Sequence, residues 1–223
     1  MKVALCLSGQ PRSFEKGFEY YKKNLLDVYD VDVFLHTWYY DFFDYSKLID
    51  LYKPKSIKVQ KPLNINLERF SQYCNYNIFS LFYGIKQSYS LLQETENDED
   101  FKYDWVVRSR YDYALNFSPD FSKLDQKKLY VPKSLRDDIC NDQISISSSN
   151  NAELYSFTLN NIFHFIDSGC SFAGEDLLAR NLKLYNVWNR VEYIDMNDPF
   201  PPDKYGIMPH SLIRDDFDFW VNK

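Results

Sequence analysis

The stretch KVALCLSGQPR, Lys2 to Arg12, decides how the rest of the sequence is interpreted. A mostly apolar run over 2–7 ends abruptly in Ser8, Gly9, Gln10 and Pro11. An apolar run followed by turn-forming residues predicts a buried strand that leads into a tight loop. Strands buried on both faces are typical of mainly parallel sheets. The stretch therefore favours an α/β fold.

Helical and strand patterns alternate along the rest of the chain. This order is that of a mostly parallel, doubly wound sheet flanked by helices and joined by right-handed crossovers. Ser13 is expected to cap the first helix, and the acidic segment 94–100 is expected to be a loop. Strands are predicted over 31–38, 55–60, 103–109, 129–132, 144–147 and 191–194, and helices over 14–28, 45–52, 77–94, 151–166 and 175–185.

The composition argues against several classes of protein. A net charge of −6 argues against general binding to nucleic acid. The four cysteines are scattered without a CxxC pair, which indicates neither a zinc site nor a disulfide framework. No stretch is long enough to span a membrane, and the N-terminal run is too short for a signal peptide. We expect a soluble, cytoplasmic protein with no transmembrane segment and no nucleic-acid partner.

Polar residues follow two of the predicted strands, where open parallel sheets bind their ligands. After the first strand, Gly9 allows a ligand close to the backbone and Arg12 suits a phosphate, although a plain tight turn is the alternative. The loop is neither a GxGxxG motif nor a P-loop. At the end of the second strand, Trp38 is suited to stack on a base or sugar, and His36 is a candidate ligand; both residues also fit a core role.

A third cluster lies in VVRSRYDYAL, 106–115. Because side chains alternate along a strand, Arg108, Arg110 and Asp112 should share one face and Ser109 and Tyr111 the other. Two cations and one anion on one face either pair internally or meet a charged ligand.

Four segments together carry a resemblance: ALCLSGQPRSF (4–14), DVFLHTW (32–38), YDWVVRSRYD (103–112) and FAGEDLL (172–178). In this order they resemble the nucleotide-sugar-dependent glycosyltransferases of the GT-A fold, notably small virus-encoded and capsule-type members. The resemblance extends from Lys2 to about Tyr185. It implies a GT-A-like sheet and a single glycosyltransferase domain over 1–223. Residues 1–115 would form the nucleotide-binding half, and 116–223 the acceptor-binding half with a C-terminal covering tail.

The implied activity is that of a hexosyl- or deoxyhexosyltransferase in glycan biosynthesis. It would move a sugar from a nucleoside-diphosphate donor to a hydroxyl group of a glycan or glycoconjugate acceptor, with inversion as the favoured stereochemistry. A non-catalytic nucleotide-sugar or glycan-binding module on the same fold is the alternative. An enzyme with an aspartate nucleophile after the first strand is disfavoured, since Ser8 and Gly9 stand there.

The resemblance also implies a metal site. The family's strand-end Asp-x-Asp motif holds Mn²⁺ or Mg²⁺ on the donor diphosphate, and here Asp112 matches its second carboxylate while Arg110 replaces the first. A cation is needed there because the leaving diphosphate accumulates negative charge. His210 would complete the metal shell. In the alternative, Arg108 or Arg110 supplies the positive charge and no metal is needed.

The remaining roles follow from the same match. GED, 174–176, resembles the motif that provides the catalytic base, so Asp176 would activate the acceptor and Glu175 would bind it. Acidic residues also simply favour a first helical turn, which is the alternative. Asp142 is a second acceptor-binding candidate. The predicted donor-binding residues are Ser8, Gly9, Gln10, Arg12, His36, Trp38, Arg108, Arg110 and Asp112.

Overall fold

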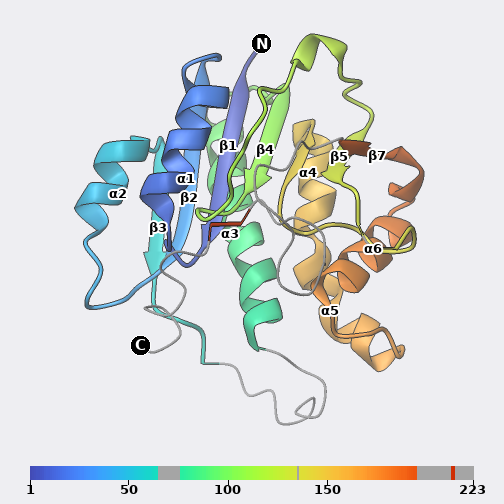
Figure 1. The fold of residues 1–223 in the computed structure, drawn as a ribbon. Helices are drawn as coiled ribbons and strands as arrows, with labels where there is room; N and C mark the ends of the chain where they lie inside the picture. The colour runs from blue at the N-terminus through green and yellow to red at the C-terminus, as the bar shows by residue number, and fades with distance from the viewer. Residues whose placement is uncertain (65–75, 135, 195–211, 214–223) are drawn as a thin grey trace.

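The protein forms a mixed α/β structure around a seven-stranded sheet (Figure 1). The structure is a computed structural model, which describes residues 1–64, 76–134, 136–194 and 212–213. The strand order is β3-β2-β1-β4-β6-β5-β7. The strands are β1 (Val3–Gly9), β2 (Val31–Trp38), β3 (Ser56–Gln60), β4 (Trp105–Ser109), β5 (Leu129–Pro132), β6 (Ser145–Ser147) and β7 (Val191–Ile194).

The first four strands form a parallel block, and β6 runs antiparallel to its neighbours β4 and β5. The chain moves outward from β1 to β3 and then returns to place β4 on the other side of β1. The strand order therefore reverses between β1 and β4, which is where an open α/β sheet usually binds its ligand. The predicted doubly wound, mostly parallel sheet is confirmed.

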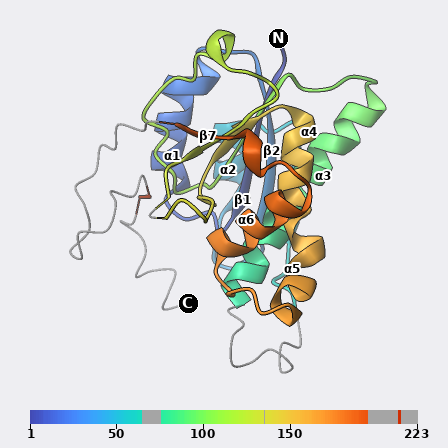
Figure 2. The same cartoon turned by 90° about the vertical axis from the view of Figure 1, so that its right-hand side faces the viewer.

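Helices cover both faces of the sheet (Figure 2). Helices α1 (Phe14–Tyr21) and α2 (Tyr45–Tyr52) pack on one face, where Leu5, Leu35 and Val107 form the core. Helix α3 (Tyr76–Asp98) packs on the other face, against Cys6 and Phe34. The remaining helices, α4 (Ser149–Ser156), α5 (Thr158–Asp167) and α6 (Gly174–Leu184), share a second core with α3 and β5.

Several predicted elements differ from the structure. The helix predicted over 14–28 is α1 followed by a π-helical turn, Lys22–Leu26, and the helix predicted over 151–166 is divided at Phe157 into α4 and α5. Ser13 does not cap α1: its φ is +50°, and its hydroxyl donates to the carbonyl oxygen of Ile213.

The predicted loop over 94–100 is also wrong, because α3 continues to Asp98. Glu96, in this last part of the helix, is 2% exposed. Its carboxylate accepts hydrogen bonds from the Tyr103 backbone N–H (2.9 Å) and from Lys102 Nζ (2.6 Å). The acidic composition of this segment indicated a solvated turn, but Glu96 is its one buried carboxylate, and these hydrogen bonds satisfy it.

No helix within the described ranges is both long and apolar enough to cross a membrane. The covering tail predicted at the C-terminus lies almost entirely outside the described residues.

Candidate functional site

A cleft of about 580 Å³ opens at the carboxyl ends of β1, β2 and β4, where the strand order reverses. Its volume lies within the usual range for small-molecule sites, about 300–1,000 Å³. The cleft is lined by Ser8, Gly9, Gln10, Arg12, Trp38, Tyr40, Pro62, Tyr76, Asn77, Ser80, Leu81, Arg110 and Asp112. Seven of the nine predicted donor-binding residues thus lie in one cleft; His36 and Arg108 do not line it.

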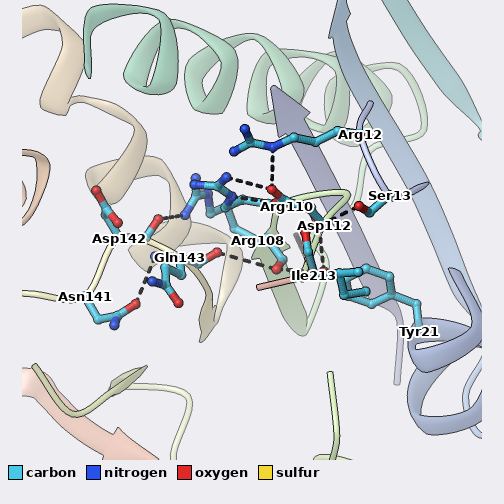
Figure 3. A network of polar contacts seen from close by, with 11 residues as sticks. Arg12, Ser13, Tyr21, Arg108, Arg110, Asp112, Asn141, Asp142, Gln143 and Ile213 are labelled. Carbon is cyan, nitrogen blue, oxygen red and sulfur yellow. Dashed lines mark hydrogen bonds and ion pairs between the residues drawn. The ribbon is translucent and has the colours of Figure 1, made fainter. Parts of the chain in front are cut away.

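A buried carboxylate joins two arginines at one side of this cleft (Figure 3). Arg12 Nε donates to Asp112 Oδ2 (2.7 Å), while Arg110 donates from Nε to Oδ1 (2.8 Å) and from Nη2 to Oδ2 (2.9 Å). Burial alone would raise the pKa of Asp112, but Arg110 and Arg12 hold that pKa below its usual value. We call these three residues the arginine–aspartate cluster. Two guanidinium groups and one carboxylate leave it with a net charge of +1.

The geometry of the cluster depends on a turn rather than on the pleat of a strand. Because β4 ends at Ser109, Arg110 and Asp112 lie in the turn that follows, and the prediction that Arg108, Arg110 and Asp112 share one face of a strand is wrong. The Tyr21 hydroxyl forms hydrogen bonds with the Ser109 hydroxyl and the Arg110 carbonyl oxygen, both at 2.8 Å. The backbone N–H of Ile213 donates to the Asp112 carbonyl oxygen (2.7 Å). Helix α1 and a distant part of the chain therefore hold the turn in place.

The residues around Asp112 do not fit the predicted divalent metal. Both carboxylate oxygens already accept hydrogen bonds from guanidinium groups. Among the described residues no group of three His, Cys, Asp or Glu side chains could hold a metal ion, and His210 lies outside those residues. Two like unit charges 4 Å apart repel each other by about 4 kcal/mol at an effective dielectric constant of 20. A divalent cation at that distance from a guanidinium group would be repelled by about twice this energy.

Arg108 lies behind the cleft instead of lining it. Its side chain is almost fully buried, Nη1 donates to the Asp142 carbonyl oxygen, and the guanidinium lies 5.6 Å from the centre of the Tyr155 ring. Nε and Nη2 have no hydrogen-bond partner among the described residues. Arg108 lines a small cavity of about 10 Å³, which is room for one water molecule. Arg108 therefore supports the segment that carries Asp142.

His36 and Trp38 differ in exposure to the cleft. His36 is fully buried and packs edge-on against Trp38, with ring centres 4.9 Å apart. Burial lowers the pKa of His36 to about 4, so the imidazole is neutral at pH 7. Trp38 stacks on Tyr83 of α3 (5.7 Å) and borders the cleft. The core role fits His36, whereas Trp38 is 5% exposed and lines the cleft.

Three carboxyl groups gather where α6 begins. Gly174 permits this approach, because a Cβ at this position would collide with Asp142 Oδ2 and would lie 3.5 Å from Leu81, a residue of the cleft wall. Asp176 Oδ1 accepts a hydrogen bond from Arg136 Nη2 (2.8 Å). Burial, reinforced by the charges of Asp142 and Asp176, raises the pKa of Glu175 to about 7. We call Asp142, Glu175 and Asp176 the carboxylate group.

Asp142 connects the carboxylate group with the arginine–aspartate cluster. Burial raises the pKa of Asp142, and the charges of Arg108 and Arg110 partly oppose this rise. Burial lowers the pKa of Arg110, but Asp112 and, to a smaller extent, the charge of Asp142 raise it above its usual value. After burial, the charge of Asp142 is also the next cause of the raised pKa of Glu175. Asp142 therefore interacts electrostatically with the cation Arg110 on one side and with Glu175, whose pKa is about 7, on the other.

Sequence reasoning missed the part of the cleft that α3 provides. Tyr76, Asn77, Ser80 and Leu81 belong to the first turns of α3. The sequence pattern marks this segment only as an amphipathic helix, so no local signal distinguishes a cleft-lining residue from a core residue. Arg136, the partner of Asp176, had no signal either.

The chain belongs to the family described as Domain of unknown function (DUF7796), whose model matches residues 1–212. No curated protein matches the sequence. Among solved structures, one similar chain is described as a glycosyltransferase involved in the glycosylation of the major capsid of PBCV-1. It shares 10% identity at a TM-score of 0.48 and covers 87% of this chain and 82% of its own. Another is described as a putative nucleotide-diphospho-sugar transferase from Desulfovibrio desulfuricans G20. It shares 9% identity at a TM-score of 0.42, with coverages of 86% and 79%.

Proposed function

We propose that this member of the DUF7796 family transfers a sugar from a nucleoside-diphosphate donor to a hydroxyl group of a glycan acceptor. The observation that carries the proposal is a cleft lined by a cluster of net positive charge, which Asp142 connects electrostatically to Glu175, a carboxyl group of pKa about 7 at the start of α6. Glycosyl transfer needs both: positive charge stabilises the leaving diphosphate, and a carboxylate accepts the proton of the attacking hydroxyl.

The donor would lie along the carboxyl ends of β1 and β4. Gly9 has a φ of +115° and open space where a side chain would be, so a phosphate can approach the backbone closely. Arg12 and Arg110 line the same cleft, and their guanidinium groups suit phosphate oxygens. Trp38 would support the base or the sugar by stacking.

The acceptor would approach from the side of α6. Within the proposal, the electrostatics favour Glu175 as the proton acceptor, where the sequence match favoured Asp176. Glu175 has a pKa of about 7, which allows it to accept a proton at neutral pH, whereas Asp176 is engaged by Arg136. Asp176 and Asp142 would then position the acceptor and maintain the raised pKa of Glu175.

The test combines donor binding with turnover. Thermal shift with UDP-, GDP- and dTDP-sugars identifies a donor, because a ligand that binds the native state raises the melting temperature. Release of the nucleoside diphosphate then measures turnover. Glu175→Gln should retain donor binding and lose roughly 10²–10⁴-fold in kcat, the usual contribution of a general base. Asp176→Asn should lose less.

The pH dependence provides a second criterion. The base must be ionised, so kcat of the wild type should rise with pH through about 7 and level off above it. If kcat is independent of pH in this range, Glu175 is not the base. If no donor sugar binds, the proposal fails. Binding without hydrolysis or transfer would identify a non-catalytic binding module.

A further inference from the structure

We propose that the cleft binds the diphosphate of its ligand through Arg12 and Arg110 without a divalent metal. That the diphosphate belongs to a sugar donor rests on the proposed function. That the cleft binds a diphosphate group rests on the residues of the cleft alone. In this arrangement the carboxylate of Asp112 positions the guanidinium groups of Arg12 and Arg110 to bind the ligand.

The carboxylate oxygens of Asp112 are already engaged by the two arginines. The side chain is 2% exposed, and three N–H groups from two arginines occupy it. These bonds take three of the roughly four lone-pair sites of an ionised carboxylate, so at most one site is left for a metal. A divalent cation bound there would lie beside two guanidinium groups of the same sign.

The guanidinium group of Arg110 is already oriented by Asp112. Arg110 uses Nε and Nη2 on Asp112, and no described residue bonds to its Nη1. Its backbone carbonyl is held by Tyr21, and its side chain reaches the cleft. A planar guanidinium held along one edge can direct its remaining N–H groups to phosphate oxygens, a geometry that favours bidentate recognition.

The cleft also contains two buried serine residues. Ser8, at the end of β1, is 3% exposed, and Ser80, on α3, is 9% exposed. Both line the cleft, and neither Oγ has a hydrogen-bond partner among the described residues. Buried polar atoms in native proteins almost always find partners, so these two hydroxyls have hydrogen bonds to offer to a ligand or to a bound water molecule. Two guanidinium groups and two hydroxyls together match the oxygens of a diphosphate.

The experiment is calorimetric titration of inorganic pyrophosphate, UDP, GDP and dTDP into the full chain, first in EDTA and then with Mn²⁺ or Mg²⁺ in place of the chelator. We expect pyrophosphate and at least one nucleotide to bind in EDTA, with no gain in affinity when the metal is supplied. Binding that is absent in EDTA and restored by the metal would overturn the inference.

Variants identify the side chains involved. Arg110→Gln should weaken pyrophosphate binding by roughly 10- to 100-fold, as expected for lost hydrogen bonds to a charged group. The double variant Ser8→Ala, Ser80→Ala should weaken it by roughly two- to tenfold. Arg190→Gln removes one exposed positive charge that does not line the cleft, and should leave binding unchanged.

Two further outcomes separate this inference from the proposed function. Metal-independent pyrophosphate binding with no affinity for any donor sugar would support the anion site and reject the glycosyltransferase. Donor-sugar binding that requires a metal would support the glycosyltransferase and reject the metal-free anion site. Circular dichroism verifies that each variant folds, and equal binding by folded Arg110→Gln and wild type would overturn the role of Arg110. The wild-type comparison with and without chelator depends on no variant.

Discussion

Replacement of Asp112 by asparagine tests the arginine–aspartate cluster through protein stability. The carboxylate is buried and accepts hydrogen bonds of 2.7 to 2.9 Å from Arg12 and Arg110. Asparagine has nearly the same shape, but it removes the charge and turns an N–H donor toward one guanidinium. Breaking a buried pair costs about 3–5 kcal/mol. We therefore expect Asp112→Asn to lower the free energy of unfolding by about that amount.

The matched control is Asp27→Asn. Asp27 forms an ion pair with Lys22, but both side chains are more than half exposed. Exposed pairs contribute about 0–1 kcal/mol, so this variant should be close to the wild type. Urea denaturation at pH 7 measures the free energy of unfolding of all three proteins, and the two variants should differ by about 2 kcal/mol or more.

The pH dependence of the same measurement has a definite sign. Because the arginines depress the pKa of Asp112 in the folded state, its contribution is present above the usual carboxyl value of 3.8. It is lost as the pH falls through the folded-state value, so the wild type should approach Asp112→Asn in strongly acidic solution. Equal losses for Asp112→Asn and Asp27→Asn at pH 7 would refute the buried cluster. An advantage of the wild type that appears only with Mn²⁺ would instead identify Asp112 as a metal ligand.

Two further substitutions test how α1 supports the turn after β4. Gly17→Ala would drive a Cβ into the carbonyl oxygen of Tyr111; we expect a loss of about 1–3 kcal/mol by urea denaturation, despite the helix propensity of alanine. The exposed Glu19→Ala should stay within about 0.5 kcal/mol, and an equally small effect for Gly17→Ala would exclude the close approach. Tyr21→Phe removes the hydroxyl bonded to the Arg110 carbonyl and should cost about 1–3 kcal/mol. Unchanged stability and unchanged pyrophosphate binding would show that this bond does not hold the turn.

Much of the fold could be predicted because its signals are local. The strands over 31–38, 129–132 and 191–194 and the helix over 45–52 have the predicted bounds. Apolar runs and helical spacing reflect which side chains must be buried, and both can be recognised within a short stretch of sequence. The strand-end loop Ser8 to Arg12 was identified for the same reason, since polar residues that interrupt a buried strand lie at the edge of the sheet.

Predictions that depended on which partner a side chain meets in the folded chain failed or stayed open. Glu96 belongs to an acidic segment that resembles a loop, yet Tyr103 and Lys102 satisfy its carboxylate in the folded chain. Ser13 has the right residue type for a helix cap, but its hydroxyl bonds to Ile213, 200 positions away. The sequence could not tell whether the charges near Asp112 pair with each other or with a metal, because Arg12 lies 100 residues from Asp112.

The sequence by itself determined the alternating α/β architecture, the edge of the sheet at which a ligand can bind, and the residue types available there. Only the tertiary structure decided which of these residues meet. It placed His36 in the core, joined Arg12 and Arg110 to one buried carboxylate, and brought Asp142 to Glu175. The physical reason is that a side chain's hydrophobicity and backbone preference act locally, whereas the pairing, burial and pKa of a charged group depend on neighbours that only the folded chain supplies.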